Sequence, residues 1–257
     1  MGKILFNENG HQCIVFDEIL DKAAKNAEDI QTNQFLIINN DEGLLYDPGG
    51  AKVFQPLFSK LTDYIDPKNI EKIVISHQDP DTGAAVNYWS IFTSAEVYIS
   101  SLWIRFIPHF SRMEAKKERF KEIPDSGLKL SLGTAEILLL PAHFIHSPGN
   151  IQLYDKKSKI LLSGDLGVGF AHNTTFEEVK NFEVHTQYME AFHKRYIPSN
   201  KALRLWADMA SKLDIDMIVP QHGKCYFKGK EMVGKFINWA RNYKCGLDLM
   251  EDFKTPE

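Results

Sequence analysis

The chain has 257 residues, of which 44% are hydrophobic and 25% charged, and this globular composition excludes a disordered, collagenous or disulfide-dense protein. Thirty basic residues against thirty-four acidic ones give a formal net charge of −4, and without a basic patch no nucleic-acid partner is expected. Three scattered cysteines, a start unlike a signal peptide and the lack of a membrane-length apolar run predict a cytoplasmic protein that does not engage a membrane.

Short apolar runs open the chain and predict strands, at residues 13–16, 35–38 and 43–47. The polar segment between the second and third of these runs has the residue chemistry of a hairpin turn. From Val53 to Ile65 the apolar residues recur at helical spacing, which predicts an amphipathic helix that ends before Pro67. A compact strand is expected directly afterwards, at residues 72–76.

The rest of the chain alternates between the two patterns. Strands are expected at 96–99, 128–130, 136–140, 151–154, 160–162 and 216–219, helices at 82–92, 176–179, 188–195, 202–213 and 231–242, and a basic amphipathic stretch at 112–121. The strands fall into two groups, each with helices, and no Pro/Gly/Ser-rich linker separates them. We therefore predict one α/β domain over residues 1–257, with two facing mixed sheets and helices on both outer faces. A doubly wound parallel sheet is the alternative, and the hairpin-like strand pairs argue against it.

Side chains that can ligate metals follow the predicted strands. His77, Asp79 and Asp81 come directly after strand 72–76, and alternate positions of an extended chain project to one side. Pro80 disfavours the helical conformation for Asp79, although a bend after Asp79 could aim Asp81 at a different point. Two carboxylates and an imidazole beside a buried strand are costly unless something offsets their charge.

Three further candidates, His146, Asp165 and His222, also come just after predicted strands, where α/β proteins bind their ligands. Taken singly, each of the six has an ordinary alternative as a hydrogen-bonded polar residue, a turn residue or, for Asp165, a helix N-cap. Together they form a convergent set of three imidazoles and three carboxylates, and such a mixed set favours iron or manganese over zinc.

The other histidines match no motif. His143 could orient a ligand or simply lie near the site. The remaining ones are expected to be surface or structural residues, namely His11, His109, His172, His185 and His193.

The order and spacing of the six candidates resemble the metallo-β-lactamase superfamily, and within it the flavodiiron branch. That branch is marked by an H-x-E-P-D-H motif, then a lone His, a bridging Asp in a G-D segment and a final His. The steps from Asp81 to His146, Asp165 and His222 in turn are 65, 19 and 57 residues. The resemblance implies one metal held by His77, Asp79, His146 and Asp165, and another by Asp81, Asp165 and His222.

Two positions depart from the family motif. The Glu of the motif is Asp79 here, and its closing His is Thr82. The second metal would therefore have a ligand fewer, which leaves room for water or a diatomic molecule. The Thr82 hydroxyl could hydrogen-bond an oxygen species bound there.

The resemblance is greatest to the stand-alone oxygen-binding di-iron proteins, which lack a flavodoxin domain. It implies two iron ions with an oxo or peroxo bridge (Fe–O–Fe), no FMN in this chain, and O2 binding, with sensing or carriage of oxygen in bacterial signalling such as chemotaxis. The resemblance also suggests that the chain forms a homodimer and has a redox or chemotaxis signalling partner. An O2 or NO reductase with an external electron donor, which would make the protein an enzyme, is the alternative. A dinuclear zinc hydrolase fits less well.

Overall fold

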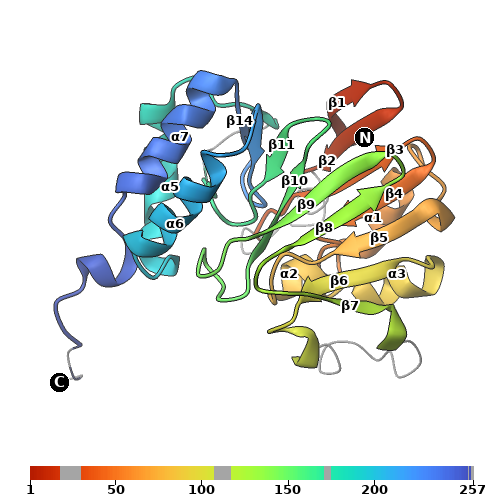
Figure 1. Cartoon of the computed structure of the whole chain (residues 1–257), viewed down its shortest axis with the longest axis horizontal. Helices are drawn as coiled ribbons and strands as arrows, with labels where there is room; N and C mark the ends of the chain where they lie inside the picture. The colour runs from red at the N-terminus through yellow and green to blue at the C-terminus, as the bar shows by residue number, and fades with distance from the viewer. Residues whose placement is uncertain (18–29, 107–116, 171–174, 254, 256–257) are drawn as a thin grey trace.

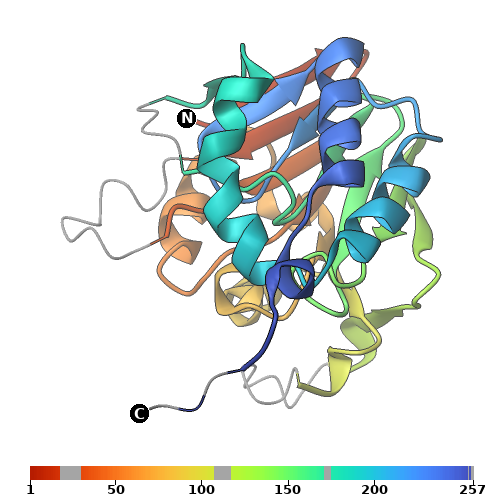
Figure 2. The ribbon, with the colours of Figure 1, turned by 90° about the vertical axis from the view of Figure 1, so that its left-hand side faces the viewer.

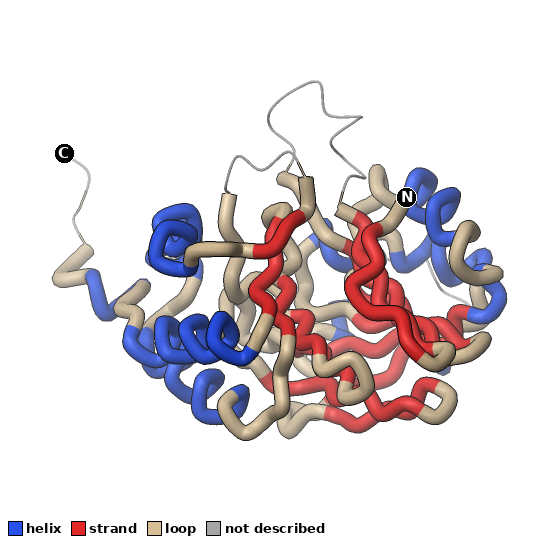
Figure 3. The backbone as a smooth tube through the Cα atoms, turned by 90° about the horizontal axis from the view of Figure 1, so that it is seen from above, coloured by secondary structure: helices blue, strands red, loops and turns tan. Residues whose placement is uncertain are grey.

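Two seven-stranded sheets face each other in the computed structural model, which describes residues 1–17, 30–106, 117–170, 175–253 and 255 (Figures 1 and 3). The strand order in the first sheet is β1 (Lys3–Glu8), β2 (His11–Phe16), β3 (Gln34–Asn39), β4 (Glu42–Tyr46), β5 (Ile70–Val74), β6 (Glu96–Ser100) and β7 (Phe120–Ile123). Strands β1 to β4 pair antiparallel and β4 to β7 parallel. The sheet is therefore mixed, as the sequence predicts.

The second sheet is mixed as well. Its order is β12 (Glu177–Glu178), β14 (Cys225–Lys228), β13 (Met217–Val219), β11 (Ile160–Leu162), β10 (Ile151–Asp155), β9 (Ala135–Pro141) and β8 (Leu128–Leu132). Two of its pairs are parallel, β11 with β13 and β12 with β14, and the others are antiparallel. These antiparallel pairs rule out the doubly wound parallel sheet.

Helices cover the outer face of each sheet. The first sheet carries α1 (Phe54–Leu61), α2 (Pro80–Gly83) and α3 (Val86–Phe92), and the second carries α5 (Phe182–Tyr196), α6 (Asn200–Ala210) and α7 (Lys230–Asn242). Short 3-10 turns complete the described chain, at Pro67–Asn69, Ile104–Phe106, Lys117–Arg119 and Gly246–Leu249. Figure 2 shows α5, α6 and α7 lying across the second sheet. None of the helices in the described part of the chain is long and apolar enough to cross a bilayer.

Alternation along the strands explains the layers. In β2, Cys13 and Val15 belong to the apolar core between the two sheets, whereas Ile14 and Phe16 belong to the core beneath α1 and α3. Because both faces of such a strand are buried, its sequence reads as a continuous apolar run. A third core lies between the second sheet and helices α5 to α7. The predicted αββα sandwich is confirmed.

Several predicted elements are wrong in detail. Residues 82–92 form two helices, because the Ala85 N–H donates to Gly49 O (2.9 Å) and interrupts the helical ladder. Residues 176–179 are not helical but contain β12, which pairs with β14. Four residues carry too little periodicity to decide between a helix and a strand, so tertiary pairing decides it.

Element ends and edge strands also differ from the prediction. Helix α1 ends at Leu61 rather than Ile65, and α5 begins at Phe182, where the Asn181 side chain accepts a hydrogen bond from Val184 N. Strands β1, β7 and β14 were not expected. Strand β7 includes the last residues of the stretch that was predicted to be basic and amphipathic. The first residues of that stretch, 112–116, lie outside the described residues, as do His109 and His172.

Candidate metal centre

The two sheets meet at one end of the sandwich, where the candidate ligands lie. The Asp47 N–H, just after β4, donates to Val74 O at the end of β5, and Ile151 N at the start of β10 donates to Ser76 O. Ser163 N, after β11, similarly donates to Val219 O, at the end of β13. The loops that follow β5, β9, β11 and β13 therefore converge at this end.

His77 is buried, with 1% of its surface exposed, and its ring is held from behind. Its Nδ1 lies 2.7 Å from the Ser76 hydroxyl, while Ser76 N–H donates to the Asp47 carboxylate (2.8 Å). Among the described residues, its Nε2 has no hydrogen-bond partner. When Nδ1 carries the proton, Nε2 presents a lone pair to the centre of the site.

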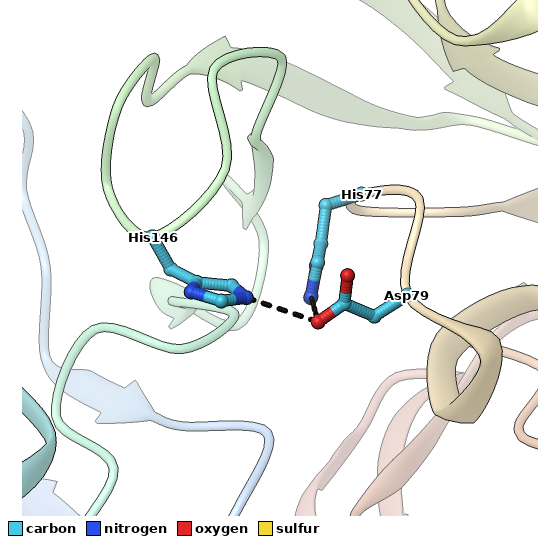
Figure 4. Close-up of side chains that lie close together, drawn as sticks. All are labelled: His77, Asp79 and His146. Carbon is cyan, nitrogen blue, oxygen red and sulfur yellow. Dashed lines mark hydrogen bonds and ion pairs between the residues drawn. The ribbon is translucent and has the colours of Figure 1, made fainter. Parts of the chain in front are cut away.

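Asp79 and Asp81 point to different places. Asp79 is extended (φ −67°, ψ 146°), and Pro80 begins the short helix α2, so the chain bends between the two carboxylates. Asp79 Oδ2 lies 3.0 Å from His146 Nε2 and 3.6 Å from His77 Nε2 (Figure 4). Asp81 Oδ2 instead lies 3.4 Å from His222 Nε2. The possible bend after Asp79 is present.

His146 occupies a left-handed backbone conformation (φ +64°), which is uncommon outside glycine. Hydrogen bonds across the loop hold it there: Ile145 N donates to Ala142 O, and the Asn150 side chain donates to Ile145 O. This backbone strain is stored at the point where the imidazole meets Asp79, as is common at functional sites.

The candidate ligands form two groups, one of His77, Asp79 and His146 and the other of Asp81 and His222. Asp165 lies between these two ligand groups and is almost completely buried. Its Oδ2 is 3.7 Å from His77 Nε2 and 3.6 Å from His146 Nε2, whereas its Oδ1 is 3.5 Å from His222 Nε2. One carboxylate thus turns one oxygen to each of two ligand groups. This is the arrangement required of a carboxylate that bridges two metal ions.

His222 is fixed by residues that the sequence did not single out. Its Nδ1 donates to Gln31 O (2.8 Å), so Nε2 is left to face Asp81 and Asp165. The Asn33 side chain donates to both Pro220 O and Gly223 O, on either side of His222. Gln31 and Asn33 carry no ligand motif, so only their position in the fold reveals this role.

The charges at this end are strongly coupled. Burial lowers the pKa of His77, but the carboxylates of Asp165 and Asp79 more than reverse this effect and leave it at about 9. Burial raises the pKa of Asp79, but the hydrogen bond from His146 and the nearby imidazole of His77 bring it well below its usual value. Burial raises the pKa of Asp47 to about 7 despite the nearby His77. Protons thus offset part of the negative charge, and a bound cation would displace them.

The donor set fits metal ions on geometric grounds. The contacts among the six side chains are 3.0–3.7 Å. Ligands about 2.0–2.2 Å from a metal are roughly 3.0–3.6 Å from one another in octahedral or tetrahedral sites. His77 Nε2 and Asp165 Oδ1 are buried without hydrogen-bond partners in the described structure, and a metal would satisfy both. Three carboxylates suit two divalent cations.

A cavity of about 640 Å³ opens over the site. Phe170, Phe192 and Tyr196 line it together with the ligand carboxylates. The rings of Phe192 and Tyr196 stack with centroids 4.7 Å apart, and both contact the His146 ring. The cavity is therefore large enough for a small molecule and has an apolar aromatic wall on one side.

Thr82 does not fit the expectation that its hydroxyl contacts an oxygen ligand. Its Oγ1 lies within donor distance of His77 O (2.9 Å) and Asp79 O (2.7 Å), and the residue is fully buried. The single hydroxyl proton is thus used to hold the ligand loop. His143 Nε2 lies 2.9 Å from Asp125 O, and His143 belongs to neither ligand group.

Comparisons with known proteins place the fold among related proteins. The family model described as "ODP family beta lactamase" matches residues 30–223. A solved structure of the peroxy diiron species of the chemotaxis sensor ODP has a TM-score of 0.84 and 38% identity, and covers 96% of this chain and 97% of that one. The apo state of the sensor from T. denticola has a TM-score of 0.82 and 37% identity, and covers 97% of each chain.

More distant relatives are longer proteins. Rubredoxin oxygen:oxidoreductase from Desulfovibrio gigas has a TM-score of 0.75 at 18% identity, covering 93% of this chain and 61% of that one, which shows a shared fold. The putative diflavin flavoprotein A 3 of Nostoc sp. strain PCC 7120 is 27% identical over 82% of this chain. The chain spans only 36% of that relative and 52% of another curated relative.

Proposed function

Because this chain belongs to the ODP beta lactamase family, we propose that it binds O2 at a pair of iron ions and acts as an oxygen sensor or carrier. The metal ligands in this proposal are His77, Asp79, His146, Asp165, Asp81 and His222. The observation that carries the proposal is the orientation of Asp165, whose two oxygens face two separate ligand groups. The similarity to a sensor solved as its peroxy diiron species supports iron as the metal.

The residues of this chain hold and shield such a site. His77 and His146 would supply imidazole nitrogen donors, and Ser76 and Gln31 fix the rings of His77 and His222 through their second nitrogens. Phe192 and Tyr196 form an aromatic wall on one side of the cavity. Two ferrous ions, when bound, would supply a place to coordinate O2 and one electron each. The six ligands leave each ion short of six protein donors, so an external molecule has room to bind.

Signalling and location belong to the same proposal. The relatives described as a chemotaxis sensor support a partner that reads the oxygenated state. A homodimer, a redox partner and competition by NO are further parts of the proposal. All three cysteines are buried and unpaired, which suits a reducing cytoplasm.

Anaerobic loading with Fe(II) tests the proposal. We expect two irons per chain, a charge-transfer band in the visible spectrum after stoichiometric O2 is admitted, and loss of that band on degassing if the protein carries oxygen reversibly. Zn(II)-loaded protein is the control, because zinc has no redox chemistry and should remain colourless. An iron content of one or less per chain would refute the dinuclear assignment.

A reductase is the competing function, and the similarity to a diflavin flavoprotein is the observation that favours it. Steady consumption of O2 or NO, driven by NADH through a rubredoxin-type or flavin donor, would establish it. A single stoichiometric uptake of O2 without turnover would instead support binding.

A further inference from the structure

Gln78 and Ser147 connect two of the loops that carry candidate ligands. Gln78 lies between His77 and Asp79, and its Nε2 donates to Asp79 Oδ1 at 2.9 Å. Ser147, which follows His146, donates its hydroxyl to Gln78 Oε1 at 2.5 Å. A hydrogen-bonded chain thus runs from the loop after β9 through Gln78 to the carboxylate of Asp79.

The partners of Gln78 determine which way its amide points. A carboxylate only accepts hydrogen bonds, so the amide nitrogen must face Asp79. The amide oxygen then faces Ser147, whose hydroxyl donates to it. The reversed amide would set its oxygen against the oxygen of the carboxylate. Both ends of the side chain are satisfied in one orientation alone, and that orientation fixes the Asp79 carboxylate.

Asp79 consequently uses its two oxygens for different purposes. Oδ2 faces both imidazoles (Figure 4), whereas Oδ1 accepts the hydrogen bond from Gln78. Asp79 is also the N-cap residue of α2, but its side chain accepts no capping hydrogen bond. The helix therefore does not compete with Gln78 for Oδ1.

We propose that Gln78, braced by Ser147, is a positioning residue that restricts Asp79 to a single metal contact, through Oδ2. Carboxylates bind metals through one oxygen or through both, and the second oxygen fills a coordination position. By engaging Oδ1, Gln78 keeps that position open for an external ligand. This inference rests on the proposed function, because it assumes that the six side chains hold metal ions.

Azide binding to the Co(II)-loaded full-length chain tests the inference without any oxygen chemistry. Azide is a small anion that occupies an open position, and the visible Co(II) absorption reports the number of ligands. In Gln78→Met, which keeps the side-chain length but removes the donor, Oδ1 is free to bind. We expect weaker visible absorption and azide affinity lowered about tenfold, the lower end of the loss for removing a ligand's hydrogen-bond partner.

Two further variants make the result interpretable. Ser147→Ala leaves the Gln78 amide without its brace, and we expect a change in the same direction but smaller. Gln55→Met, at an exposed position of α1, should bind azide as the wild type does. If Gln78→Met fails to fold, Ser147→Ala decides the question.

Wild-type absorption and azide affinity in both site variants would overturn the inference. Failure of a wild-type Co(II) protein to bind azide would overturn it as well. The proposed function fails differently, through iron-loaded wild-type protein that takes up no O2. The two failures are therefore distinguishable.

Discussion

Buried histidines and aspartates gather at both ends of the sandwich, and the two gatherings differ in their hydrogen bonds. At the end away from the candidate metal centre, His11 Nε2 lies 2.6 Å from Asp155 Oδ2, and His11 Nδ1 lies 3.2 Å from Asn39 Oδ1. The Ser158 hydroxyl and the Lys157 N–H both donate to the same Asp155 carboxylate. The polar side-chain atoms of His11 and Asp155 are thus all paired with protein groups.

The other end leaves comparable atoms unpaired. His77 Nε2 and Asp165 Oδ1 are buried and have no hydrogen-bond partner within the described chain. An unpaired buried polar atom costs about 1–3 kcal/mol. The comparison teaches that burial of His and Asp does not by itself indicate a metal site. Buried donor atoms that converge on one point without pairing do indicate such a site, because a bound metal ion would offset the cost of leaving them unpaired.

The largest expected effect comes from breaking the paired end. Asp155→Ala leaves His11 buried without its carboxylate, and removal of one partner from a buried pair destabilises by about 3–5 kcal/mol. We expect the free energy of unfolding in urea to fall by that amount, with metal stoichiometry unchanged at low temperature. Asp214→Ala, which removes exposed ion pairs with Lys159 and Lys230, is the matched control and should change stability far less. Loss of metal in folded Asp155→Ala protein would contradict the separation of the two ends.

A substitution at the candidate metal centre should instead weaken metal binding and leave the stability of the metal-free protein nearly unchanged. Among the carboxylates in the described ranges, Asp165 alone faces both ligand groups, so we expect Asp165→Ala to lose both metals. We expect metal affinity to fall at least about 100-fold, because removing a residue that only hydrogen-bonds a metal ligand already costs up to that much. Metal analysis after gel filtration measures it, while urea unfolding of the metal-free protein should show a far smaller change than Asp155→Ala. Two tightly held irons in this variant would refute the bridging role.

His193 is a buried histidine of a third kind, which has no carboxylate partner among the described residues and should make the stability of the protein depend on pH. His193 accepts a hydrogen bond from Gly167 N–H and lies near Met189 O, and burial lowers its pKa to about 4. Between pH 6.5 and 4 the unfolded chain binds a proton that the folded chain refuses, so stability falls as pH falls. The expected loss from this residue is on the order of 2 kcal/mol between pH 7 and pH 5.

His193→Gln is the variant that isolates this contribution. It retains an acceptor for Gly167 but does not titrate. Its unfolding free energy should therefore depend less on pH than that of the wild type over the same range. Parallel pH profiles for the two proteins would show that His193 is not held neutral.

The smallest effect is expected at Thr82. Thr82→Val removes the hydroxyl that bonds the carbonyls of His77 and Asp79, and the loss of a hydrogen bond costs about 1 kcal/mol. Thr82→Ser, which keeps the hydroxyl, should restore most of that stability. Equal lifetimes of the oxygenated form in Thr82→Ser and Thr82→Val would support the role of the hydroxyl in holding the loop. A lifetime that changes only in Thr82→Val, at unchanged stability, would instead favour a contact between the hydroxyl and the oxygen ligand.

The sequence predicted the elements whose pattern is local. The strand containing Cys13 and the strand before His77 were found because both faces are buried and their residues are continuously apolar. The six candidate ligands were singled out because they follow strands in a fixed order. The split between α2 and α3 could not be predicted, since it depends on a hydrogen bond from Ala85 to the distant Gly49.

The supports of the candidate ligands were beyond the sequence for the same reason. Gln31 holds the ring of His222 across 191 positions, and at the opposite end of the sandwich His11 meets Asp155 across 144 positions. No spacing rule connects such residues, because their contact exists only once two sheets have packed. The Thr82 hydroxyl is a related case, since a polar side chain beside ligands can face a bound molecule or its own backbone.

By itself, the sequence determined which residues were available for ligation and which segments were apolar enough to form sheets. The tertiary structure decided where each donor atom points: Asp79 and Asp81 diverge at Pro80, Asp165 divides its oxygens between two groups, and Gln78 turns one oxygen of Asp79 aside. The physical reason is that hydrogen bonds and coordination depend on direction within a fraction of an ångström, whereas hydrophobic burial depends mainly on area and periodicity, which a linear pattern records.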